Sequence, residues 1–305
     1  MAEGLETTAP RPFEALRAGS SHPAPAIQGA ALLGLLAAIY GRTAAVLWAT
    51  WTTNDNYSHG PLVPVVALGM VWSMRARLRD TPVRPDARGL GLVAAACVLE
   101  VVGLRADVFA LQGYSLIFML YGLALAFLGG AWTRRLAFPI GYLAFMLTFP
   151  PVVIQQLSYA LKEIAVRLAT HAAEALGVTF QRRGMTVYLA SGALRVDNPC
   201  SGLRSLLALL ATGAAFAFFQ PGAWWRRACL VAAAIPIAVA SNAIRLTALL
   251  LVGHYAGVPV ATGKFHDASG YMVYVLAILG LFAVRAALGG AAPRSAAAAA
   301  KGDRP

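Results

Sequence analysis

Charge is scarce in this chain. Asp, Glu, Lys and Arg together make up 12% of its 305 residues, which is about half of what a soluble domain carries. Hydrophobic residues make up 59%, and they gather in windows that are long enough to cross a bilayer. This composition excludes an ordinary soluble domain and indicates an all-α integral membrane protein with several passes.

Acidic residues are scarcer than basic ones, with 13 against 25 and a formal net charge of +12. In a membrane protein this excess reflects arginine-rich loops on one side of the bilayer, together with attraction to anionic lipid. It therefore does not indicate a nucleic-acid partner. Membrane lipids are the expected non-protein partners.

Cysteine is also rare, and the three cysteines, Cys97, Cys200 and Cys229, lie far apart. No Cys-x-x-Cys pair occurs, which argues against a thiol–disulfide exchanger or a zinc cluster. Cys97 and Cys229 lie inside apolar runs, as small core residues do. Cys200, His254 and His266 lack metal-ligand spacing, so we expect neither a metal nor another cofactor.

Two further absences concern organisation. The first 25 residues are polar, rich in Pro and Ala, and lack a signal-peptide pattern. We expect flexible cytoplasmic tails over 1–26 and 289–305, flanking one transmembrane domain over 27–288. No internal repeat is found, which argues against a transporter built from inverted halves.

About eight spans are predicted, and basic residues fall between alternate ones. This pattern predicts that both termini are cytoplasmic. Arg42 falls inside the first span, so we expect that span to be short or interrupted there. The predicted spans are 27–49, 60–78, 89–105, 111–131, 135–154, 200–219, 226–253 and 268–288.

The opposite, periplasmic side then carries a long segment over 150–199. Its first part, 155–176, is amphipathic and is expected to lie along the membrane surface. The next part alternates polar and apolar residues around two glycine turns. It predicts a short β-hairpin, formed by 186–189 and 194–196, that delivers the chain to Cys200.

Cys200 lies in the run Asn198-Pro199-Cys200-Ser201-Gly202-Leu203-Arg204. Pro199 suits a first helical position, with Asn198 or Asp197 as the cap. The helix dipole would then bias the thiol toward thiolate, its reactive form. The alternative is a structural cysteine at the start of a helix.

The predicted topology brings Arg245 and His266 to the same face as Cys200. A buried arginine in a membrane helix is costly and marks a functional-site candidate. The three side chains would make a cysteine acyl-transfer site, with thiolate attack, proton transfer by histidine, and an oxyanion or substrate held by arginine.

Each of these residues also has a simpler interpretation. Arg245 could bond to a carbonyl group or to Glu100, and His266 could be a solvated loop histidine. Asp267 could orient His266, although adjacent side chains usually point apart. Arg204, four residues after Cys200, could support the site or be the true anion partner.

A second polar run, Tyr57-Ser58-His59-Gly60, precedes the second predicted span on the same outer face. Structurally it is a turn into a helix, which Gly60 and Pro61 explain. Functionally, Tyr57, Ser58 and His59 could line a substrate cleft.

These motifs resemble the exosortases, multi-pass transpeptidase-like proteins of Gram-negative bacteria with archaeal relatives. The resemblance covers about 27–288, and Asn198-Pro199 departs from the Glu-Ala that many members have before the cysteine. The motifs, in order, are Tyr57-Ser58-His59-Gly60, Cys200-Ser201-Gly202-Leu203-Arg204, Asn242-Ala243-Ile244-Arg245, and His266 with Gly270.

The resemblance implies an inner-membrane cysteine enzyme that acts on exported proteins with a C-terminal sorting signal. That signal (PEP-CTERM) is a Pro-Glu-Pro motif, a transmembrane helix and a basic tail. The catalytic residues would be Cys200, Arg245 and His266. Arg204 and Asn242 would bind the substrate or support the site, as would the Tyr57–His59 run. The acceptor nucleophile is left open as water, an amine or a hydroxyl.

Two other function classes compete with this one. The chain could be a non-catalytic membrane component of exopolysaccharide export or assembly, in which Cys200 is structural. Replacing Cys200 separates these two hypotheses. A small-solute transporter is less favoured, because its polar groups would lie near the bilayer midplane and not at one face.

Overall fold

The computed structural model describes residues 25–196 and 202–288. The predicted tails and the run 197–201, which includes Cys200, therefore lie outside the described residues. The described chain is mostly helical, which confirms an all-α membrane protein. Four helices are long and apolar enough to cross a membrane, namely Gly29–Thr53, Phe109–Leu128, Trp224–Tyr255 and Lys264–Ala287.

The predicted count of eight spans is not confirmed. A fifth span results if Gly130–Met146 and Pro151–Ala175, which are bent by 80° at their junction, count as one. The other predicted spans correspond to shorter helices. A 12-residue helix such as Leu62–Ser73 is only about 18 Å long, whereas the apolar core of a bilayer is about 30 Å thick.

The first helix, α2 (Pro25–Thr53), runs without interruption through Arg42. The expectation of a short or broken span was therefore wrong, and the physical reason is that arginine is a good helix former with a long, flexible stem. The chain divides into two compact units, 1–45 and 46–305. The fold and the site described below belong to the second unit.

The first half of this second unit is a set of packed helices. Residues 88–128 form a helical hairpin whose two arms lie close together, since a Cβ atom at Gly89 would clash with the backbone of Ala126. Inside the hairpin, Ser115 donates a hydrogen bond of 2.6 Å to the buried Glu100. The elements are η1 (Asp55–Tyr57), α3 (Leu62–Ser73), α4 (Arg75–Arg79), α5 (Arg88–Arg105), α6 (Phe109–Leu123), the π-helical η2 (Ala124–Leu128), α7 (Gly130–Tyr142) and η3 (Leu143–Met146).

The predicted span over 135–154 ends earlier than expected. After η3 the chain is extended at Leu147 and turns sharply before α8 (Pro151–Ala175) begins. The two consecutive prolines, Pro150 and Pro151, explain this break, because a residue before proline is driven out of the helical region. The Trp51 indole holds the break in place by donating a 2.9 Å hydrogen bond to the Met146 carbonyl.

A small sheet follows α8. It contains β1 (Gln181–Arg183), β2 (Thr186–Leu189) and β3 (Gly192–Arg195), antiparallel in that order. The sequence predicted two strands, and the structure has three. Arg182 in the extra strand donates a 2.9 Å hydrogen bond to Glu163 of α8. An ion pair therefore joins the sheet to α8.

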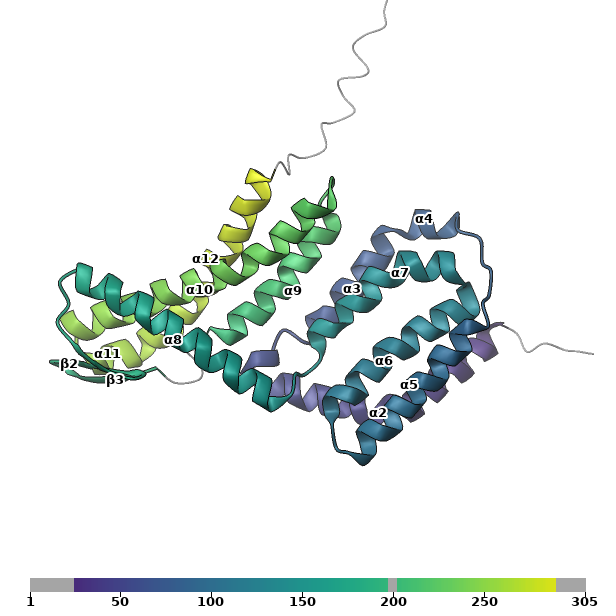
Figure 1. Ribbon diagram of the computed structural model, residues 1–305, viewed down its shortest axis with the longest axis horizontal. Helices are drawn as coiled ribbons and strands as arrows, with labels where there is room; N and C mark the ends of the chain where they lie inside the picture. Colours follow the sequence, from purple (N-terminus) through teal and green to yellow (C-terminus); the bar gives the residue numbers. More distant parts are fainter. Residues whose placement is uncertain (1–24, 197–201, 289–305) are drawn as a thin grey trace, which may run out of the picture. The chain divides into compact units, whose positions relative to one another are not determined.

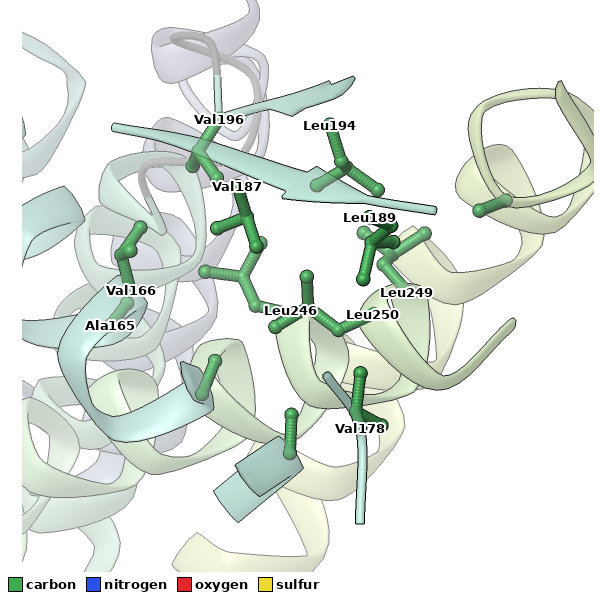
Figure 2. Packing of buried hydrophobic residues seen from close by; sticks show 13 residues of the cluster. Ala165, Val166, Val178, Val187, Leu189, Leu194, Val196, Leu246, Leu249 and Leu250 are labelled. Carbon is green, nitrogen blue, oxygen red and sulfur yellow. The ribbon is translucent and has the colours of Figure 1, made fainter. Parts of the chain in front are cut away.

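One face of the sheet is apolar because its side chains alternate. Val187 and Leu189 on β2, with Leu194 on β3, are buried, as the two-residue repeat of a strand requires. Figure 2 shows these side chains meeting Leu246 and Leu250 of α10. The sheet and α8 thus form a cap that encloses one end of α10.

The last part of the chain contains α9 (Leu203–Phe219), α10 (Trp224–Tyr255), α11 (Val258–Thr262) and α12 (Lys264–Ala287). In Figure 1, α9, α10 and α12 run side by side, and each packs against the other two. Their shared core includes Leu230, Ala234, Ala277 and Leu281, all almost fully buried. This three-helix group positions the candidate site.

Candidate active site

The length of α10 sets the depth of the site. Its 32 residues span about 48 Å, compared with about 30 Å for the bilayer core. Trp224 and Trp225 are exposed on the first turn, where tryptophan suits a membrane interface. Arg245 lies about 32 Å further along the helix axis, a distance close to the thickness of the bilayer core. Leu246 and Leu250, which follow Arg245 on α10, pack against the cap formed by the sheet and α8.

Arg245 is buried, with 8% of its surface exposed, and its guanidinium is held by α12. Its Nε donates to the Ser269 hydroxyl at 2.9 Å, and its Nη2 donates to the His266 carbonyl at 3.1 Å. Ser269 in turn donates to the same carbonyl at 2.7 Å. Among the described residues, no acceptor is bonded to Nη1, so one edge of this fixed cation can bind another group.

His266 lies in the first turn of α12. The prediction of a loop position was wrong, because α12 begins four residues earlier than the predicted span. The imidazole is 28% exposed, its Nε2 lies 3.4 Å from Arg245 Nη2, and its Nδ1 lies 3.6 Å from an Asp267 carboxylate oxygen. Since Arg245 can only donate, Nε2 acts as the acceptor in this pair. Asp267 is 84% exposed.

The chain enters α9 through Gly202, at φ +75°. A left-handed residue cannot continue a helix, so α9 begins at Leu203, three residues later than the predicted span. A Cβ atom on Gly202 would lie 3.0 Å from the Asn242 amide, so only glycine allows this close approach. Asn242 is 2% exposed and precedes Arg245 by one helical turn.

This contact places Gly202 next to the Arg245 turn of α10. Cys200 lies outside the described residues, two positions before Gly202 in the sequence.

The Tyr57-Ser58-His59 run lies at the same end of α9. Tyr57 is buried in a cluster with Leu203 and Leu206, and its hydroxyl accepts a 3.0 Å hydrogen bond from the Phe149 N–H. Burial raises the pKa of the Tyr57 phenol, and that hydrogen bond opposes the rise. Ser58 is exposed and ends η1, so it packs least of the three.

His59 has one satisfied and one unsatisfied nitrogen. Its Nε2 lies 3.1 Å from the Phe145 carbonyl, which can only accept, so the proton is on Nε2. Nδ1 is buried without a partner. Burial lowers the pKa of His59 most, the charge of Arg204 lowers it further, and the Phe145 hydrogen bond opposes both. His59 is therefore a neutral side chain with an open acceptor.

Arg204 lies on the first turn of α9 and faces the loop that carries Asp55. Its Nη1 is 3.6 Å from the Asp55 carboxylate, which is 77% exposed, and its Nε is buried without a partner. An exposed ion pair of this length contributes little stability. The guanidinium is therefore available to a better-placed acceptor.

Sequence reasoning missed two side chains of this site. Ser269 escaped because the start of α12 was placed too late, so its helical relation to His266 was hidden. Tyr274, eight residues after His266, lies on the same helical face. Its hydroxyl lies near Ser205 and within electrostatic range of Arg204 and Arg245. A helical spacing of four residues from His266 through Gly270 to Tyr274 is the signal that could have found it.

Within 25–196 and 202–288, no group of three or more His, Cys, Asp or Glu side chains could hold a metal ion. The geometry brings together a fixed arginine, Arg245, and a neighbouring histidine, His266. Gly202, at the start of α9, lies close to the same part of α10. Such an arrangement can bind and polarise a carbonyl group.

No curated protein and no solved structure matches the chain significantly. The model of the transmembrane exosortase family matches residues 51–283, a region that contains every element of the site from Tyr57 to Tyr274. Families of this kind are in general membrane transpeptidases or proteases with membrane-associated protein substrates. The chain therefore belongs to the transmembrane exosortase family.

Proposed function

We propose that this protein is a membrane-embedded cysteine protease or transpeptidase that cleaves C-terminal sorting signals of exported proteins. The observation that carries the proposal is the network of Arg245, Ser269 and His266 at one end of α10 and α12. Gly202 approaches the same turn of α10, and Cys200 is two residues from it. Cys200, Arg245 and His266 are the proposed catalytic residues.

In the proposed reaction, the Cys200 thiolate attacks a backbone carbonyl of the substrate. The carbonyl oxygen becomes an oxyanion, and the open edge of Arg245 stabilises it. The C–N bond then breaks, the acyl group stays on sulfur as a thioester, and His266, which took up the proton of the Cys200 thiol, delivers it to the departing amine. Water, an amine or a hydroxyl then attacks the thioester, loses its proton to His266 and releases the Cys200 thiolate.

The expected signal is a Pro-Glu-Pro motif followed by a transmembrane helix and a basic tail. Two features support recognition of its acidic residue. Arg204 and Arg245 add positive charge to the candidate active site, while the carboxylates of Asp55 and Asp267 near it are exposed to solvent. The neutral acceptor of His59 suits a substrate backbone N–H. Asn242 would hold the segment that carries Cys200.

The proposal also includes a topology. The domain over 27–288 would lie in the inner membrane, with the tails 1–26 and 289–305 in the cytoplasm and the active site on the periplasmic face. The arginine-rich loops support this orientation. The length of α10 supports a site at the outer interface, because about a third of this helix exceeds the bilayer core.

The decisive variant is Cys200→Ala. We expect it to abolish processing of a reporter that carries the sorting signal, assayed by immunoblot, with the enzyme still inserted and at normal abundance. Cys97→Ala and Cys229→Ala are matched controls, since each removes a thiol far from the site in the sequence, and both should process normally. Full processing by Cys200→Ala would support a non-catalytic role in exopolysaccharide export or assembly.

A further inference from the structure

The opposite end of the same three helices carries polar groups that the proposed reaction does not use. Gln220, in the turn after α9, is 1% exposed. Its carbonyl accepts from Arg227 Nε at 3.0 Å, and its side-chain oxygen accepts from Arg285 Nε at 3.1 Å. Arg285 can only donate, so the atom it contacts must be the side-chain oxygen of Gln220, and the other terminal atom must be the amide nitrogen.

That amide nitrogen, Gln220 Nε2, is buried and has no hydrogen-bond partner. The Nε of Arg226, six residues further on, is also buried without a partner. Both atoms are donors. A buried donor without an acceptor is costly and needs an explanation. The turn between α9 and α10 therefore has donors to spare and lacks acceptors.

A cavity of about 670 Å³ lies beside this turn, between α3, α7, α9 and α10. Two guanidinium groups line it, those of Arg77 and Arg227, and the rings of Phe138 and Phe218 stack at 5.3 Å along it. Within the described part of the chain, neither arginine forms an ion pair. A cavity of this volume is within the usual range for a small-molecule site.

The two kinds of lining indicate an amphipathic anion. The two arginines match phosphate oxygens, while the aromatic rings match a hydrocarbon chain. The exposed Trp224 and Trp225 at the start of α10 suit a membrane–water interface, where phospholipid headgroups lie. Basic pockets between membrane helices are a known setting for anionic lipids.

We propose that this cavity binds an anionic phospholipid, with its phosphate at Arg77 and Arg227. Its acyl chain lies along Phe138 and Phe218. The bound lipid joins α3 and α7 to α9 and α10 at the end remote from the candidate active site. This proposal goes beyond the proposed function and does not depend on Cys200.

The test measures lipid binding by the purified full chain in a neutral detergent, using native mass spectrometry. Phosphatidylglycerol should bind at a defined stoichiometry, and phosphatidylcholine should not. Arg77→Gln and Arg227→Gln should each weaken phosphatidylglycerol binding about fivefold, as expected for one arginine near an anionic lipid. Arg88→Gln removes an exposed arginine that does not line the cavity and should change nothing.

Two further arms keep the proposal falsifiable. Ala228→Phe fills the cavity without changing charge and should abolish binding. If Arg227→Gln does not fold, Arg77→Gln still tests the proposal, because the Arg77 guanidinium makes no hydrogen bond in the described structure. Unchanged binding in Ala228→Phe and Arg77→Gln would overturn the proposal. So would equal binding of phosphatidylcholine, or displacement of phosphatidylglycerol by millimolar inorganic phosphate.

Discussion

The two ends of the α9, α10 and α12 group satisfy their arginines in different ways. At one end, Arg245 donates to Ser269 and to the His266 carbonyl, both on the neighbouring helix. At the other end, Arg227 and Arg285 both donate to the single residue Gln220, whose own amide nitrogen has no acceptor.

The difference separates a cation built into the structure from one that needs a ligand. The acceptors of Arg245 hold its guanidinium in a fixed position, which is what a preorganised oxyanion donor requires. The donors around Gln220 exceed the acceptors that the described protein supplies, and the proposed anion binds beside them, at Arg77 and Arg227. The following predictions test this contrast, from the largest expected effect to the smallest.

The largest effect is expected for Arg245→Lys. An ammonium keeps the charge but cannot direct one nitrogen to Ser269, another to the His266 carbonyl and a third to substrate. Processing of the sorting-signal reporter should fall about 100-fold, as for loss of an oxyanion donor. Arg204→Lys is the control and should retain more activity. The reverse ranking would mean that Arg204 is the essential arginine.

A tenfold effect is expected for Ser269→Ala. The variant leaves Arg245 Nε without its acceptor, and a hydrogen bond to a charged group contributes about 1.5–3 kcal/mol. The processing rate should fall about tenfold, while abundance and membrane insertion stay normal. Ser269→Thr keeps the hydroxyl and should restore most of the rate. A Thr variant as slow as the Ala variant would exclude a role through this hydroxyl.

At the other end, Gln220→Glu should stabilise the protein. A carboxylate there accepts more strongly from Arg285, and charge-assisted hydrogen bonds are about twice as strong as neutral ones. We expect Tm to rise by about 2 °C, in line with roughly 1 kcal/mol for a protein of this size. Phosphatidylglycerol binding should weaken, because the new carboxylate adds negative charge beside Arg227. A lower Tm with unchanged lipid binding would contradict both expectations.

The smallest effect concerns His59. Its folded pKa lies below the ordinary value of 6.5 because burial and Arg204 disfavour the cation. The unfolded chain therefore binds a proton at higher pH than the folded one, so His59 contributes its full stability above about pH 6.5 and loses it as pH falls toward the folded pKa. His59→Gln should flatten the fall of Tm between pH 7 and pH 5. An unchanged slope would show that His59 does not titrate in this way.

Much of this contrast could be predicted from the sequence. Scarce charge and apolar windows indicated the helices, and a buried arginine in a membrane helix marked Arg245 in advance. The motifs also indicated the family, which the match over 51–283 confirms. These features depend on residue type and on spacing along one element, and both can be read directly from a sequence.

Other features required the structure. Gly202 adopts a left-handed conformation because it packs on Asn242, 40 residues away, and no local pattern reveals that contact. The early start of α12, and with it the role of Ser269, also depends on tertiary packing. The surplus donors at Gln220 arise because three segments meet at this one residue: the turn that contains it, α10 with Arg227, and α12 with Arg285. Sequence spacing carries no information on such convergence.

The length of α10 has a consequence for substrate choice. This continuous helix carries Trp224 at one interface and Arg245 about 32 Å further along. It therefore fixes the distance from that interface at which the proposed cleavage reaction would take place. A substrate helix crossing the same bilayer would present to this arginine only the residues just beyond its own membrane exit. In the proposed reaction, the number of substrate residues between the cleavage motif and the substrate's membrane helix would select substrates as strictly as the motif itself.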